Sequence, residues 1–176
     1  FPTRRSSDLF LMRPRKLLRR SIGRPDMRKN LGALVAAFGC SPALQEQANL
    51  AIVAGNRDDI RKLDAAQTEV MTNLLLDIDL YDLWGKIALP KQHKSSDVAG
   101  LYRLAAQRRG IFVNPALTEP FGLTLIEAAA SGLPIVATED GGPRDIIAHC
   151  KNGVLVNPLD IKAIAGAMEY ALAEPR

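Results

Sequence analysis

The chain has 176 residues, of which 47% are hydrophobic and 24% charged, with a net charge of +4 and a sequence pI of about 9.3. This length and composition are sufficient for one domain with one sizeable core. The positive charge does not favour a nucleic-acid partner, because much of it lies in the first twenty residues and aromatic residues make up only 5% of the chain.

The apolar runs and the metal-binding residue types exclude further classes. No apolar run approaches the roughly 18 residues that a membrane-spanning helix needs, and the N-terminus lacks the pattern of a signal peptide, so we expect a cytoplasmic protein with no membrane partner. Cys40 and Cys150 are isolated in the sequence and are predicted to be small buried residues in a reducing compartment. His93 and His149 are isolated as well, so no metal site is expected.

The opening stretch, FPTRRSSDLF, has no hydrophobic periodicity and resembles translated adaptor sequence from genome assembly. We therefore expect residues 1–13 to be a non-native or disordered tail and residues 14–176 to form the domain. Just after this tail, Arg19 and Arg20 are unusual for a buried parallel strand.

Short apolar runs alternate with longer segments of helical periodicity in the rest of the chain. The runs predict strands over 17–23, 49–55, 85–90, 110–115, 133–138 and 152–158. The periodic segments predict helices over 31–38, 59–79, 97–107, 121–132, 141–150 and 160–174. In the long helix over 59–79, the expected core positions are Ile60, Leu63, Val70, Leu74 and Ile78.

The order of these elements is a strand followed by a helix, repeated about six times. Strands that are apolar throughout are typical of a parallel sheet covered by helices on both faces. The predicted fold is therefore an α/β, doubly wound, Rossmann-like domain. Such sheets bind ligands at the carboxyl ends of their strands.

The loops that follow the predicted strands carry cations, glycines and carboxylates, whereas the strands themselves are apolar. Arg24 and Lys29 follow the first strand, and they are suited to binding a diphosphate. The fourth loop is NPALTEPFG and contains Glu119, and the fifth is TEDGGP. Because function gathers in loops at one edge of such a scaffold, we expect these residues to form one site.

The helix after the fourth loop is predicted to bind phosphate at its start. The backbone N–H groups of Gly122, Leu123 and Thr124 are expected to point outward at the positive end of the helix dipole. Gly122 has no Cβ, so a phosphate can approach the backbone closely. Glu127 lies one turn further on and is expected to bind ribose hydroxyls, while Glu119 is expected to bind those of a sugar.

Each of these features also has an ordinary structural explanation. Two glutamates on a loop and a helix are commonly solvated, a Gly-Gly-Pro sequence after a strand is commonly a turn, and Arg28 and Lys29 could begin an exposed helix. Their occurrence on successive loops is what favours a site for a nucleotide sugar.

In these motifs the sequence resembles the retaining glycosyltransferases of the GT-B fold, and within family 4 the group of sucrose-phosphate synthases and sucrose synthases. The motifs, in chain order, are RPDMRKN, GNRDD, PKQHKSSDV, YRLAA, NPALTEPFGLTLIEAAASGLPIVAT and GGPRDI. The resemblance extends from about Gly23 to the C-terminus. It implies the C-terminal, donor-binding half of a GT-B fold, with UDP-glucose as the donor and no other cofactor.

The resemblance also implies catalytic roles. Arg24 and Lys29 would hold the diphosphate and stabilise the departing UDP, and Glu119 would contact the hydroxyls of the glucosyl group. The family's reaction retains the anomeric configuration and uses no protein nucleophile, so stabilising the leaving-group charge is the main catalytic task. No metal is expected, because the two cations supply the positive charge.

Donor binding is implied for a second set of residues. Backbone amides near Phe121 and Gly122 would help to bind the glucosyl hydroxyls, and those of Leu123 and Thr124 would bind phosphate. Glu127 would bind the ribose, and Lys91 would border the uracil.

The acceptor remains open on the residues of this chain. In the family a sugar phosphate, fructose 6-phosphate, is held by an N-terminal domain that has no counterpart here, so the chain is expected to be a fragment. The alternatives are a UDP-sugar-binding module without catalytic activity, or a relative such as sucrose synthase or mannosylfructose-phosphate synthase, and GDP remains an alternative to UDP. A dehydrogenase is disfavoured, because no G-x-G-x-x-G follows the first strand.

Overall fold

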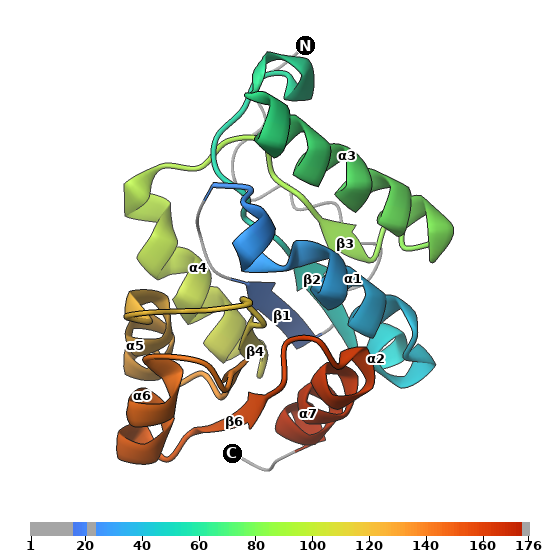
Figure 1. Cartoon of the computed structure of the whole chain (residues 1–176). Coiled ribbons are helices and arrows are strands. Elements are labelled where there is room, and N and C mark those ends of the chain that lie inside the picture. The colour runs from blue at the N-terminus through green and yellow to red at the C-terminus, as the bar shows by residue number, and fades with distance from the viewer. Residues whose placement is uncertain (1–15, 21–23, 174–176) are drawn as a thin grey trace.

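The computed structural model describes residues 16–20 and 24–173, with side chains from residue 24 onward. Over these ranges, six parallel strands form one sheet in the order β3-β2-β1-β4-β5-β6 (Figure 1). The strands are β1 (Lys16–Arg20), β2 (Ala48–Ala51), β3 (Ile87–Ala88), β4 (Ile111–Asn114), β5 (Ile135–Thr138) and β6 (Gly153–Val156). The order reverses between β1 and β4, which is the Rossmann arrangement, so the predicted doubly wound α/β fold is confirmed.

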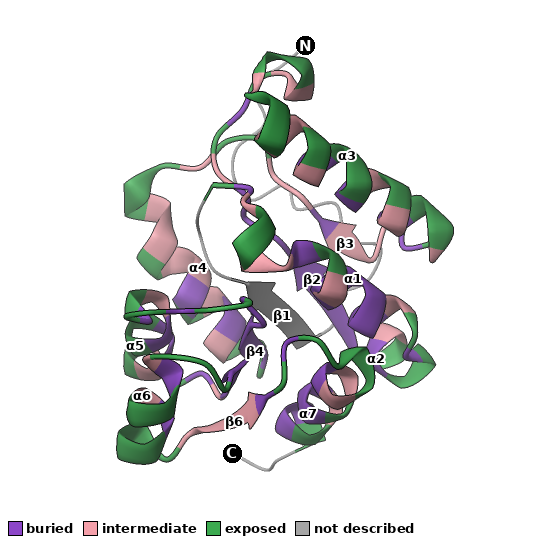
Figure 2. Cartoon of the chain, viewed as in Figure 1, coloured by how far each residue is buried: buried purple, intermediate pink, exposed green. Residues whose placement is uncertain are grey.

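Helices cover both faces of this sheet (Figures 1 and 2). One layer contains α1 (Leu31–Gly39), α2 (Pro42–Gln47), α3 (Ala65–Leu80) and α7 (Ile161–Ala173). The other contains α4 (Ser95–Gln107), α5 (Leu123–Ala130) and α6 (Pro143–Cys150). Successive side chains of β4 point to opposite faces of the sheet. Ile111 and Val113 therefore pack in the core under the first helix layer, and Phe112 packs in the core under the second.

The helix predicted over 59–79 is wrong in its first part. The chain forms a 3₁₀ turn, η2 (Ile60–Lys62), and then an extended residue, Leu63, before α3 begins at Ala65. The cause is Asp64, whose carboxylate accepts a hydrogen bond from the backbone N–H of Gln67 at 2.8 Å and so caps a new helix. Within α3 the buried positions are Met71, Leu74 and Ile78.

The other differences concern short elements. The strand predicted over 49–55 ends at Ala51, and the one over 85–90 is reduced to Ile87–Ala88. The six-residue helix α2 was not predicted, although Ser41 caps it and Pro42 occupies its first turn. Residues 1–13 and 21–23 lie outside the described residues, so what the sequence predicts for them stays a prediction.

Both cysteines are exposed, so the prediction that they are buried is wrong. Cys40 follows the last residue of α1 and Cys150 ends α6, so both side chains lie at helix ends rather than in the core. In the described ranges no helix has the length and apolar character needed to cross a bilayer.

Candidate functional site

The loops that follow β1 and β4 meet, because these strands are neighbours in the sheet. Lys29 ends the 3₁₀ turn η1 (Met27–Lys29) in the first loop, and Glu119 lies in the second. The Nζ of Lys29 donates to Oε2 of Glu119 at 3.0 Å, across 90 residues of sequence. The structure thus joins two of the residues that the sequence singled out.

The carboxylate of Glu119 is a buried anion with two further donors. The side-chain amide of Asn114 donates to Oε2 at 3.1 Å, and the backbone N–H of Gly122 donates to Oε1 at 3.2 Å. Burial alone would raise the pKa of Glu119, but the hydrogen bonds from Asn114 and Lys29, the charge of Lys29 and the Gly122 amide together hold that pKa below its usual range. Glu119 is therefore ionised at neutral pH and fixed in place.

The Gly-Gly pair of the fifth loop allows that loop to lie directly against the backbone of Glu119. Gly141 pairs with Glu119 in a parallel bridge, and the N–H of Gly142 donates to the Glu119 carbonyl at 2.9 Å. A Cβ on Gly142 would lie 2.8 Å from the carbonyl oxygen of Pro120 and 2.9 Å from that of Phe121. The pair is therefore part of the site's framework rather than an ordinary surface turn.

The start of α5 presents fewer amides than expected. Gly122 precedes the helix with a φ of +74°, and its N–H points at Glu119 instead of outward. The N–H groups of Leu123 and Thr124 have no hydrogen-bond partner within the described residues. The predicted phosphate contact therefore rests on these two amides, beside the exposed side chain of Phe121.

Within the part of the chain that the structure describes, no recorded hydrogen bond or ion pair joins three further predicted residues to the Lys29–Glu119 pair. Arg24 is exposed in the loop after β1, and Glu127 is exposed on α5. Lys91 is exposed after β3, where its Nζ donates to the carbonyl of Asp58 at 3.2 Å.

The guanidinium of Arg28, a further cation in the same motif, is held locally by Asp26. Arg28 donates to both carboxylate oxygens of Asp26, at 3.2 and 2.8 Å. These hydrogen bonds, first those of the Arg28 side chain and then that of its backbone, lower the pKa of Asp26 to about 2. Arg61 and Asp59 repeat this pairing in η2.

Arg57 is a buried cation that the sequence analysis did not single out. Its terminal nitrogens donate to the carbonyl oxygens of Pro90 at 3.1 Å and Leu89 at 3.2 Å, and its backbone N–H donates to Lys91 at 2.8 Å. Burial lowers the pKa of Arg57. This residue joins the loops after β2 and β3 and so fixes the backbone at Lys91. Its position in GNRDD, shortly after the buried apolar run that ends at Ala54, was the available signal.

Asn30 and Asn114 also belong to the site and were missed. Asn114 is fully buried at the end of β4, where a polar residue closes an otherwise apolar strand. Asn30 follows Lys29 and has a left-handed backbone conformation, which asparagine adopts more readily than most residues. Both signals were present in the sequence, but neither indicates which partner the side chain meets.

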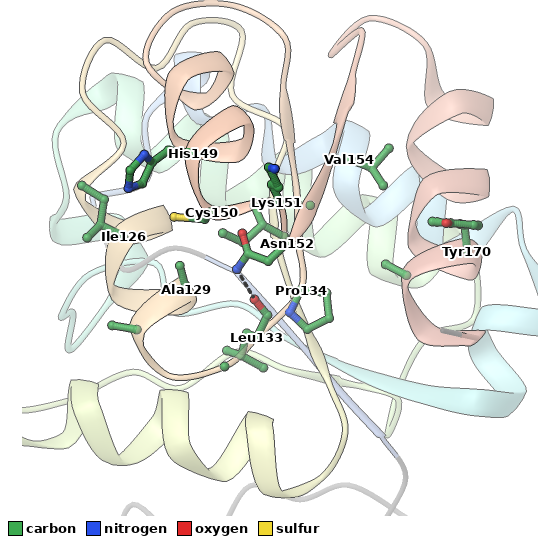
Figure 3. Close-up of a pocket in the computed structure, with 15 residues that line it drawn as sticks. Ile126, Ala129, Leu133, Pro134, His149, Cys150, Lys151, Asn152, Val154 and Tyr170 are labelled. Carbon is green, nitrogen blue, oxygen red and sulfur yellow. Dashed lines mark hydrogen bonds between the residues drawn. The ribbon is translucent and has the colours of Figure 1, made fainter. Parts of the chain in front are cut away.

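A cavity of about 870 Å³ lies at the start of β5 and β6, which is the opposite edge of the sheet (Figure 3). Leu133, Val154 and Tyr170 line it together with His149 and Asn152. None of the site residues predicted from the sequence is among its lining residues.

Residues 13–176 match the family model for glycosyl transferases group 1. The chain belongs to this glycosyltransferase family. It is 53% identical over 165 residues to a sucrose-phosphate synthase of Zea mays and 52% identical over 165 residues to one of Spinacia oleracea. Each alignment covers 94% of this chain but only 15% and 16% of the respective relative, so the chain spans about a sixth of their length.

Solved structures agree with this glycosyltransferase assignment. The sucrose-phosphate synthase of Thermosynechococcus elongatus superposes with a TM-score of 0.74 at 31% identity, covering 91% of this chain and 37% of that one. A UDP-forming α,α-trehalose-phosphate synthase of Burkholderia xenovorans gives a TM-score of 0.75 at 22% identity, covering 92% and 36%, and supports the fold alone. The GT-B resemblance identified from the motifs is confirmed.

Proposed function

We propose that this domain binds UDP-glucose as the donor half of a retaining glucosyltransferase of the sucrose-phosphate synthase type. The observation that carries the proposal is the contact between Lys29 and Glu119 beside the start of α5, in a chain 53% identical to a sucrose-phosphate synthase. A cation, a carboxylate and outward-facing amides within one loop cluster suit a ligand that combines phosphates with sugar hydroxyls.

The cations act on the diphosphate. Lys29 and Arg24 bind its oxygens and stabilise the negative charge that develops on the departing UDP, which is a role that a divalent cation plays in other enzymes. The amides of Leu123 and Thr124 add donors at the positive end of the α5 dipole. Because the Nζ of Lys29 is already held 3.0 Å from Glu119, the Lys29 side chain needs to move little when the donor binds.

The carboxylates act on hydroxyls. Glu119 accepts hydrogen bonds from the glucosyl group, assisted by the backbone near Phe121 and Gly122, and Glu127 on α5 binds the ribose. Lys91 borders the uracil from the loop after β3, where Arg57 and Asp58 hold that loop.

The acceptor is assigned to a part of the protein outside this chain. The chain spans only 15% of the Zea mays relative, and we propose that fructose 6-phosphate is held by a further domain of a cytoplasmic enzyme. On its own, the chain is expected to bind the donor without transferring glucose. A sucrose synthase or mannosylfructose-phosphate synthase would differ in the acceptor and share this donor site.

Calorimetric titration of the chain with UDP tests the proposal. We expect saturable binding to the wild type, and a dissociation constant at least about tenfold higher for the Arg24→Ala/Lys29→Ala variant, since each charge-assisted hydrogen bond contributes about 1.5–3 kcal/mol.

A matched control comes from the second 3₁₀ turn, where Arg61 and Lys62 stand as Arg28 and Lys29 do in the first. The Arg61→Ala/Lys62→Ala variant loses the same net charge and is expected to keep its affinity for UDP. Equal losses in the two double variants would mean that only the overall charge matters. Binding of NAD in place of UDP would refute the donor assignment.

The two glutamates are expected to differ in which ligand they affect. Glu119→Gln should weaken UDP-glucose binding more than UDP binding, because only UDP-glucose carries the glucosyl hydroxyls. Glu127→Gln should weaken both equally, by about tenfold for one charged hydrogen bond. Competition titrations with the two ligands measure this. The same ratio of affinities in both variants would contradict the two roles.

A further inference from the structure

The side chain of Asn30 connects three loops at the carboxyl edge of the sheet. Its Nδ2 donates to the carbonyl oxygen of Pro115 at 2.9 Å and to that of Pro158 at 2.8 Å. Asn30 itself follows β1, Pro115 follows β4 and Pro158 follows β6. One amide group thus uses both of its N–H donors on segments that lie 85 and 128 residues away.

We propose that Asn30 is the positioning residue that holds Lys29 against Glu119 and so prepares the site for the donor diphosphate. The positioning of Lys29 by Asn30 rests on the geometry of the ligand-free chain alone. Its effect on donor binding rests also on the proposed function.

The argument follows from what lies on either side of Lys29. On one side, the carbonyl of Arg28 accepts a hydrogen bond from the N–H of Leu117 at 2.8 Å. On the other, the amide of Asn30 binds Pro115. Both neighbours of Lys29 are therefore tied to the short segment that leads to Glu119. Because the Lys29 side chain is long, its Nζ stays within 3.0 Å of Glu119 only if the backbone beneath it is held in place.

The alternative explanation, that Asn30 is an ordinary helix cap, does not account for its contacts. Asn30 precedes α1 at the N-cap position, yet its side chain caps no amide of that helix. Its φ of +55° and ψ of +44° place it in the left-handed region, which few residues with a side chain adopt. The sequence thus places at this point a residue that tolerates the conformation and also supplies two donors.

Asn30→Gly is the variant that separates these two properties, because glycine keeps the left-handed backbone and removes the amide. Two measurements follow. In the ligand-free chain, the pKa of the Glu119 carboxyl, read by carbon-13 NMR, should rise toward the ordinary value of 4.5 as Lys29 moves away. In a calorimetric titration, the dissociation constant for UDP should rise about tenfold, as for one lost charge-assisted contact.

A double-mutant cycle with Lys29→Met distinguishes positioning from general support of the fold. If Asn30 acts through Lys29, then adding Asn30→Gly to Lys29→Met causes no further loss of UDP affinity. An equal loss in both backgrounds, with the Glu119 pKa unchanged, would overturn the proposal. If neither the wild type nor any variant binds UDP, but Asn30→Gly still raises the Glu119 pKa, then the proposed function fails and the positioning role stands.

Thermal unfolding is recorded first for each variant. If Asn30→Gly does not fold, Asn30→Ser takes its place, since a serine hydroxyl can reach at most one of the two carbonyls. A rise in the Glu119 pKa of the folded serine variant above the wild-type value supports the proposal, and no change contradicts it.

Discussion

Replacing Gly141 by alanine is expected to lower the free energy of unfolding by about 3 kcal/mol. Gly141 has a φ of +81°, a conformation that costs an L-residue about 1–2 kcal/mol. The new Cβ would also lie 2.5 Å from the Glu119 carbonyl oxygen, and relieving such an overlap costs about 1–3 kcal/mol. Because the obstacle is backbone, the fifth loop must move away and give up the bond from Gly142 to Glu119.

Gly132→Ala provides the matched comparison for this effect. Its φ is +76°, but a Cβ there meets no atom within 4 Å, so only the backbone term of about 1–2 kcal/mol applies. Urea denaturation of both variants measures the difference. Equal losses of stability would show that the loop carrying Gly141 yields freely, and that the close approach to Glu119 is not a constraint on the site.

The layered sheet could be predicted from the sequence, but its strand order could not. The run Ile111–Val113 is apolar at every position, which indicates a strand buried on both faces. Which strand lies beside it depends on how each crossover packs, and that is a tertiary property. The neighbour of β4 on one side is β1, from which it is separated by most of the preceding chain.

Local competition explains the helix that was wrongly extended to Asp59. Ile60 and Leu63 continue the helical spacing, so periodicity alone cannot exclude them. Asp59 and Asp64 are both good caps, and each accepts a hydrogen bond from a backbone N–H shortly after it. Two separate helical segments therefore form here, first the 3₁₀ turn η2 and then α3.

Part of the candidate site was anticipated from the sequence, but few of its contacts were. Lys29 and Glu119 were each singled out, and the sheet edge predicted that they would be near each other. The engagement of the Gly122 amide by Glu119 was not foreseen, because a helix start by itself suggests outward-pointing N–H groups. Asn30 was quoted within a motif and given no role, since its partners at Pro115 and Pro158 follow only from the assembled loops.

Glu119 is the point at which these contacts converge, so its removal should have a large effect. Glu119→Ala would leave the donors of Asn114 and Gly122 buried without an acceptor, and each such group costs about 1–3 kcal/mol. Lys29 is 31% exposed in its side chain and can turn to water, so its loss contributes less. We expect the free energy of unfolding to fall by about 3 kcal/mol, which corresponds to a melting temperature roughly 6–12 °C lower for a domain of this size.

Glu127→Ala is the matched control, because it removes an exposed glutamate eight residues further along. Its stability should stay within about 0.5 kcal/mol of the wild type, as for most surface substitutions. Differential scanning calorimetry of the two variants gives the comparison.

Asn114→Leu tests whether the two side chains act together, since removing the Asn114 amide together with Glu119 leaves one fewer unpaired buried donor. The double variant Asn114→Leu/Glu119→Ala should therefore lose less than the sum of the two single losses. Strict additivity would mean that the two side chains contribute to stability independently, and that Glu119 is not the acceptor around which this loop is built.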